Sequence, residues 1–163
     1  MRVSWILSGF FALTFVSMPL GAGVTVTFAN PDRYTDAGKY SLRTDETVHE
    51  IERHLKRLGE RYLSPQQTLR IEVLDIDLAG EEDFLRTGRD VRVLRGRADW
   101  PRIKLRYVLE ADGRVSASKE ETLTDMNYLE GPKSRYSSEA LAYEKRMLDE
   151  WFKARFGAQR PAR

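Results

Sequence analysis

The sequence predicts an α+β fold, in which an antiparallel sheet of about five strands carries two amphipathic helices packed on one face. Two segments, 48–62 and 138–156, repeat apolar residues at steps of three and four, which is typical of helices with one buried side. Segments such as 102–110 instead alternate apolar and polar residues, as strands do when one face is buried. Turn residues separate the segments, and the expected order is β-α-β-β-β-β-α.

Composition limits the chain to one folded domain. It has 163 residues, of which 41% are hydrophobic and 32% are charged, a balance that is typical of folded proteins. There is no cysteine, which excludes a disulfide, a thiol nucleophile and a cysteine zinc site. We therefore expect a single α+β domain over residues 23–163, with a frayed tail from about residue 157.

The first 22 residues have the pattern of a signal peptide. Arg2 provides the positive start, the segment 5–16 is almost wholly apolar, and small residues follow at 21–23, where a signal peptidase can cut. The apolar segment is shorter than the roughly 18 residues that a membrane-spanning helix requires. The sequence thus predicts a periplasmic or secreted protein that does not span the membrane after cleavage. An uncleaved N-terminal anchor is the alternative.

The segment 68–78 does not fit a regular strand with one buried face. Its alternation places Leu69, Ile71 and Val73 on one face but Leu74, Ile76 and Leu78 on the other. Two explanations remain open. A β-bulge at residues 73–74 switches the phase, or the strand is central and covered on both faces.

The turn at residues 111–113 predicts a hairpin after the strand 102–110. A three-residue loop, with its glycine in the left-handed conformation, places Leu109 opposite Val115, and this is the register we expect. Lys119 and Glu121 then fall on the apolar face, which the pattern explains only if a further bulge intervenes.

Three aspartates provide a candidate acidic site. Asp75 and Asp77 alternate on one face of a predicted strand, and Asp125 joins them if its own strand lies nearby. Paired carboxylates bind hard cations, or act as acid and base when their pKa values differ. The sequence places no histidine, lysine or nucleophile beside them, and capping or pairing with arginine is the structural alternative.

The stretch 86–106 is strongly basic, with eight Arg and Lys against two Asp. Such a stretch suits phosphates, acidic glycans or an acidic protein surface. The alternative is a solvated face whose charges meet acidic residues elsewhere. Export argues against a nucleic-acid partner. The anion-binding candidates are Arg92, Trp100, Arg102, Lys104 and Arg106.

Two histidines resemble a zinc-protease motif but have the wrong spacing. His49 and His54 are five residues apart, which separates them by about 140° around a helix, against about 40° for the four-residue motif. We expect His54 to flank the buried stripe and His49 to face water. No nucleotide-binding loop or nucleophile elbow is present, and no cofactor is expected.

Several segments together resemble the bacterial family catalogued as domain of unknown function 3016. They are the segments 75–80, 100–102, 105–107, 125–128, 143–148 and 151–152. The resemblance implies a small exported or envelope protein without an assigned activity, and it transfers no catalytic residue.

The sequence therefore favours a non-enzymatic periplasmic binding domain, whose basic stretch recognises an anionic envelope component or an acidic protein surface. The alternative is a hydrolase or divalent-cation site on Asp75, Asp77 and Asp125. Convergence of these carboxylates in a pocket favours catalysis, whereas their dispersal beside an open basic face favours binding. The oligomeric state stays open at this level.

The signal peptide gives the first testable prediction. N-terminal sequencing of the protein from its host is expected to find a start between Gly21 and Thr25, because cleavage follows the small residues. Isolation of stable protein that begins at Met1 would contradict the prediction.

Overall fold

The computed structural model describes residues 23–38, 43–82, 92–96, 98–130 and 140–157. The predicted signal peptide and C-terminal tail lie outside these residues, except for Gly157 at the end of the last helix. The elements are β1 (Gly23–Phe28), η1 (Pro31–Arg33), α1 (Thr44–Tyr62), β2 (Gln67–Asp77), β3 (Glu81–Glu82), β4 (Arg92–Val93), β5 (Arg102–Ala111), β6 (Arg114–Thr124) and α3 (Ala142–Phe156).

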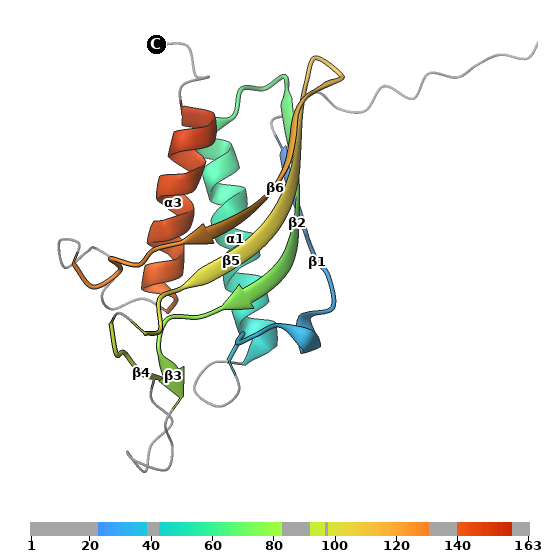
Figure 1. The fold of residues 1–163 in the computed structure, drawn as a ribbon. Coiled ribbons are helices and arrows are strands. Elements are labelled where there is room, and N and C mark those ends of the chain that lie inside the picture. Colours follow the sequence, from blue (N-terminus) through green and yellow to red (C-terminus); the bar gives the residue numbers. More distant parts are fainter. Residues whose placement is uncertain (1–22, 39–42, 83–91, 97, 131–139, 158–163) are drawn as a thin grey trace, which may run out of the picture.

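The predicted α+β class and the placement of both helices on one face of the sheet are confirmed (Figure 1). The main sheet has the order β1-β2-β5-β6, and β3 and β4 form a separate two-stranded ribbon. One pairing differs from the expected antiparallel sheet, because β1 runs parallel to β2. The reason is the connection through α1, since a helical crossover returns the chain to the same end of the sheet.

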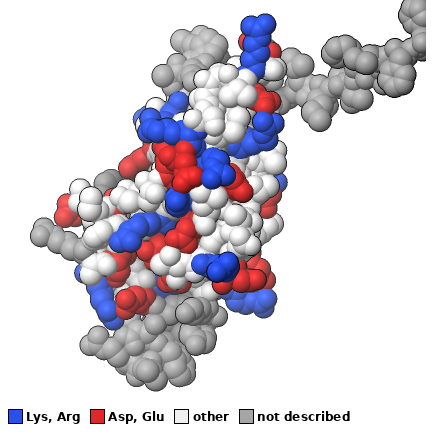
Figure 2. All heavy atoms as spheres, turned by 45° about the vertical axis from the view of Figure 1, so that its right-hand side comes forward, with Lys and Arg blue, Asp and Glu red and all other residues white. Residues whose placement is uncertain are grey.

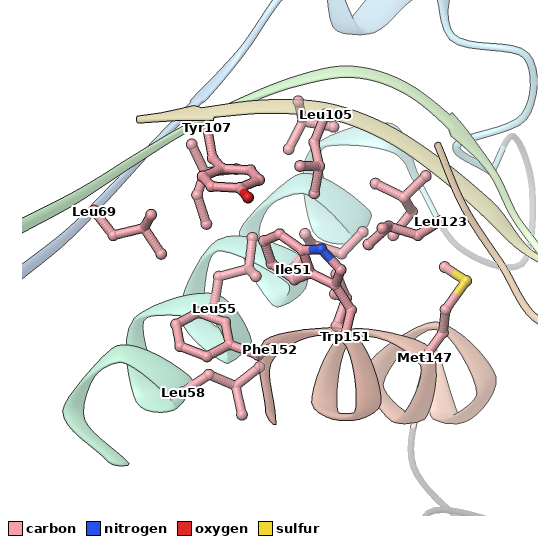
Figure 3. Close-up of a cluster of buried hydrophobic side chains, with 14 of the residues drawn as sticks. Ile51, Leu55, Leu58, Leu69, Leu105, Tyr107, Leu123, Met147, Trp151 and Phe152 are labelled. Carbon is pink, nitrogen blue, oxygen red and sulfur yellow. The ribbon is translucent and has the colours of Figure 1, made fainter. Parts of the chain in front are cut away.

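The core lies between the sheet and the two helices (Figure 3). Ile51 and Leu55 of α1 and Phe152 of α3 are fully buried. The Trp151 ring packs edge-on against Tyr107 of β5, with 5.8 Å between the ring centroids. The stripes predicted from sequence thus form the contact between the layers.

A glycine allows α1 to lie close to β1. A Cβ atom on Gly59 would come within 2.1 Å of the Val24 side chain, closer than packed atoms can approach. The first strand and the first helix are therefore in direct backbone-to-side-chain contact.

The irregularity in β2 is a β-bulge, one of the two predicted explanations. Val73 lies opposite Leu105 and Asp75 opposite Lys104, so Leu74 is the extra residue. Apolar residues before and after the bulge are buried on the same face. The other explanation, a strand covered on both faces, is wrong because the helices cover one face only.

The hairpin between β5 and β6 differs from the prediction. Its loop is the two-residue turn Asp112-Gly113, with φ of 51° and 73°, as in the tight turns that match strand twist. Leu109 lies opposite Ala117 rather than Val115, because the bulge falls inside β6 instead of in the loop.

Lys119 and Glu121 lie on the helix side of the sheet, opposite Tyr107 and Leu105 of β5. No further bulge intervenes before them to turn them outward. Glu121 accepts a hydrogen bond from Trp151 Nε1 at 3.0 Å and pairs with Arg155 at 3.0 Å. Burial raises the pKa of Glu121, but the Lys119 and Trp151 hydrogen bonds and the Arg155 charge together hold it below its usual value. An inward charge on β6 is thus satisfied by α3.

The second helix begins at Ala142, later than the predicted start at residue 138. Leu141 has a φ of 58°, a left-handed conformation that cannot continue a helix, and its carbonyl accepts the N–H of Lys145 at 2.9 Å. Among the described residues, no helix is both long and apolar enough to cross a membrane.

The packing of Trp151 generates a stability prediction. Its side chain is 8% exposed, and Trp151→Ala is expected to lower the free energy of unfolding by about 3–5 kcal/mol in urea melts. Trp151→Phe is the control, because it keeps a ring in the site and is expected to lose less. A loss under about 1 kcal/mol for the alanine variant, the size of an ordinary substitution, would show that α3 is not docked as described.

Candidate binding surface

The outer face of the sheet, the face turned away from the helices, carries the basic candidates of β5. Arg102, Lys104 and Arg106 alternate along the strand, and their side chains are 44%, 47% and 52% exposed. Both helices lie on the other side of the sheet, so no described helix covers this face of β5 (Figure 1). The predicted placement of the three cations on the open side is confirmed.

Each of these cations has an acidic neighbour on an adjacent strand. Arg106 pairs with Glu72 of β2 at 3.0 Å and with Glu120 of β6 at 2.9 Å. Lys104 pairs with Glu120 at 2.9 Å. Hydrogen bonds from Lys104 and Arg106 hold the pKa of Glu120 below its usual value. The basic stretch therefore meets acidic residues elsewhere, and blue and red side chains interleave in Figure 2.

Arg102 is held less tightly than Arg106. Its guanidinium lies 3.5 Å from the Asp77 carboxylate, and it stacks over the Trp100 ring at 4.9 Å from the centroid. A guanidinium on an aromatic face keeps its N–H edge free to take a carboxylate or phosphate. Trp100 and Arg102 thus present an exposed guanidinium on the outer face, a group that can take up a carboxylate or phosphate.

Arg92 does not belong to this surface. Its side chain is 16% exposed and pairs with Asp36 at 2.5 Å. Its guanidinium also donates to the carbonyls of Ala79 at 3.0 Å and Gly80 at 2.7 Å. This candidate therefore holds the turn that follows β2 rather than facing solvent.

Glu144 holds the same turn from the helix side. Its Oε1 accepts the Ala79 N–H at 2.8 Å, and the residue is 3% exposed. Burial raises the pKa of Glu144, although the Ala79 hydrogen bond opposes that change. The sequence reasoning missed this residue, but a signal existed, because Glu144 occupies an apolar-stripe position of α3 three residues after Leu141.

The three candidate aspartates do not converge. Asp75 accepts hydrogen bonds from the Thr35 N–H and hydroxyl, both at 2.7 Å. Asp77 faces Arg102 on the outer face, and burial raises its pKa although the Arg102 charge opposes this.

Asp125 lies instead beside α3. It pairs with Arg146 at 2.5 Å and accepts the Asn127 N–H at 3.0 Å. No group of three potential metal ligands comes together within the part of the chain that the structure describes. The three aspartates are thus divided among turns and ion pairs.

The two histidines are placed as the helix geometry predicts. His49 is exposed, and His54 is 5% exposed between the helices. His54 Nε2 lies 3.0 Å from Asp149 Oδ1 and 3.2 Å from the Lys145 carbonyl oxygen. Both partners are acceptors, so Nε2 carries the proton and the ring serves as a cross-link between α1 and α3.

A groove of about 510 Å³ lies between η1 and the start of α1. Its lining includes Asp32, Asp45, His49 and Glu52. None of the predicted site residues lines it, so it is separate from the outer face.

The fold and the outer face define a small α+β domain with a one-sided sheet and a charge-paired open surface. The family model described as "Protein of unknown function (DUF3016)" matches residues 22–154, most of the chain, and the chain belongs to this family. Comparison with curated proteins and with solved structures gives no match.

The buried Glu144 generates a prediction for stability against pH. Its raised pKa means that the folded state holds this proton more tightly than the unfolded state. The free energy of unfolding therefore loses a contribution as the pH rises from below the ordinary value of 4.5 through the raised pKa. Glu144→Gln is expected to remove this decline, as measured by urea melts across the acid range.

Glu121→Gln is the matched control, because the pKa of Glu121 is lowered. The ionised Glu121 contributes to the free energy of unfolding above the ordinary glutamate pKa, and this contribution is lost as the pH falls. Glu121→Gln is therefore expected to remove a loss of stability toward low pH, the opposite of the effect of Glu144→Gln. Parallel profiles for wild type and Glu144→Gln would contradict the prediction.

Proposed function

We propose that the chain is a non-enzymatic binding domain of the cell envelope, and that its outer face recognises carboxylate or phosphate groups of an anionic partner. The observation that carries the proposal is the exposed Arg102 guanidinium stacked on Trp100. The alternative, a hydrolase or divalent-cation site on Asp75, Asp77 and Asp125, lacks such support, because the aspartates have separate structural partners.

Binding at this face proceeds by exchange of ion pairs. A partner's anionic group replaces Asp77 beside Arg102, where the present contact is longest at 3.5 Å. Because burial raises the pKa of Asp77, the charged form of this carboxylate is poorly accommodated in its present position. Arg106 has two carboxylate partners, Glu72 and Glu120. Its positive charge attracts the anionic partner even while Arg106 keeps one of these two ion pairs.

The compensating carboxylates also set the strength of binding. Exposed ion pairs contribute roughly 0–1 kcal/mol each, so exchanging one for another gains little by itself. A useful affinity therefore requires a partner that presents several anionic groups in a row, such as a membrane surface or an acidic polymer. This favours an extended envelope component over a single small anion.

Location in the envelope rests on the N-terminal segment. Residues 1–22 combine Arg2, an apolar stretch and small residues at the expected cleavage site. The absence of cysteine means that the domain needs no disulfide formation after export. Export also brings the outer face into contact with anionic lipids and polymers.

The proposal is tested by sedimentation of the protein with vesicles of phosphatidylglycerol and, separately, of phosphatidylcholine. Binding is expected only to the anionic vesicles and is expected to weaken as salt rises, since exposed charges are screened over about 8–10 Å. Polyglutamate replaces the vesicles in a second arm, to distinguish phosphate groups at a membrane from carboxylates on a polypeptide.

Arg102→Gln combined with Arg106→Gln is expected to weaken the binding at least tenfold, which corresponds to about 1.4 kcal/mol. Lys56→Gln is the control, because Lys56 is similarly exposed, at 51%, and pairs with Glu52 on α1. Equal affinity for both kinds of vesicle, independence of salt, or unchanged affinity in the double variant would overturn the proposal.

A further inference from the structure

The two edges of the main sheet differ in charge. The edge strand β6 carries Lys119, Glu120 and Glu121 in succession, and charges of this kind prevent a strand from pairing with another chain. The opposite edge strand, β1, has the sequence Gly-Val-Thr-Val-Thr-Phe and no charge at all. The edge formed by β1 is therefore the one that the sequence leaves open to pairing.

The backbone phase of β1 shows which groups face outward. The Ala29 N–H bonds to the Val73 carbonyl at 2.9 Å, so position 29 points toward β2. Successive residues of a strand point their N–H and C=O groups to opposite sides. Val24, Val26 and Phe28 therefore present these groups to the free edge, where the described residues contain no neighbouring strand.

The side chains of the same three residues are incompletely covered. Val24, Val26 and Phe28 lie on the helix side of the sheet, opposite the buried Leu69, Ile71 and Val73 of β2, and yet they are only half-buried. Thr25 and Thr27 are exposed on the outer face. The edge thus combines unpaired backbone groups with apolar surface that a further strand would cover.

We propose that β1 pairs antiparallel with β1 of a second copy of this chain, about a two-fold axis at Val26. In this register Val26 faces Val26 of the second copy and Val24 faces its Phe28. Outward backbone groups then meet outward backbone groups, and apolar side chains stay on the helix side. Thr25 lies opposite Thr27 of the second copy, in the closer, non-hydrogen-bonded type of pair.

A second copy is the occupant that these observations favour. The pairing requires an uncharged strand that turns its outward N–H and C=O groups toward β1 and keeps its apolar side chains on the helix side. A second β1, related by a two-fold axis, meets both requirements. The two sheets then form one continuous sheet across the axis. This dimer is independent of the proposed function, because it uses the β1 edge and leaves Arg102 and Trp100 on β5 and the preceding loop open.

The first test measures molar mass by sedimentation equilibrium over a range of concentrations. The full chain has a mass of 18.9 kDa. At high concentration, the measured mass is expected to be twice that of one copy of the purified chain. Thr25→Lys with Thr27→Lys places like charges opposite each other at both symmetric pairs. Thr25→Lys with Thr27→Glu instead places opposite charges there.

The two double variants alter the same exposed positions and differ only in the sign of one charge. The dissociation constant of the dimer is expected to be about tenfold or more higher for the lysine pair than for the lysine–glutamate pair. A far-ultraviolet circular dichroism spectrum confirms that both variants fold.

The second test uses the absence of cysteine in the chain. Val26→Cys places two cysteines directly opposite each other across the axis. Their Cα atoms then lie within the range of about 4.4–6.8 Å that a disulfide requires. Val24→Cys is the control, because in this register its partner is Phe28. Oxidation is expected to cross-link the first variant and not the second.

A monomer at every concentration would overturn the proposal. A dimer whose dissociation constant is the same in both charge variants would overturn it too, and so would equal cross-linking at positions 24 and 26. None of these results bears on vesicle binding through Arg102 and Arg106.

Discussion

The single extra residue Leu74 in β2 determines how the two faces of the sheet are used. Because both helices lie on the same side, a strand must keep all its apolar residues on that side, and the sequence of β2 cannot do so with regular alternation. The bulge at Leu74 resolves this conflict, because one extra residue shifts the alternation and exchanges the two faces for the second half of the strand. Ile76 consequently joins the core at 0% exposure, and Asp75 and Asp77 turn outward.

The charges of the outer face follow from that phase change. Asp75 comes to lie opposite Lys104 and Asp77 opposite Arg102, so acidic residues of β2 stand beside the cations of β5. The same two aspartates, which by sequence resemble part of a catalytic or cation site, thereby become neighbours of a basic strand. Asp77 pairs with Arg102 and Asp75 accepts hydrogen bonds from Thr35, so the position of each carboxylate is explained without a chemical role.

The sequence allowed prediction of features that depend on local alternation. These include both helices, the bulge as one of two explanations, and the exposure of Arg102, Lys104 and Arg106. It did not allow prediction of features that depend on contacts across space. The parallel pairing of β1 depends on how α1 crosses the sheet, and the role of Arg92 depends on carbonyls of a turn twelve to fourteen residues earlier. The carboxylate partners of the basic face were likewise unpredictable, because they come from strands on both sides.

Four of the segments on which the family resemblance rests meet at one end of the sheet, namely 75–80, 100–102, 125–128 and 143–148. Glu144 of α3 holds the turn after β2, and Arg146 pairs with Asp125 and donates to the Tyr128 carbonyl. The Gly80 N–H bonds to the Asp99 carbonyl, next to Trp100. These contacts join helix, turn and loop into one support, and Trp100 and Arg102 lie directly on it. Since a binding group must be held in a fixed orientation to act, these residues would serve as the support of the recognition surface proposed above.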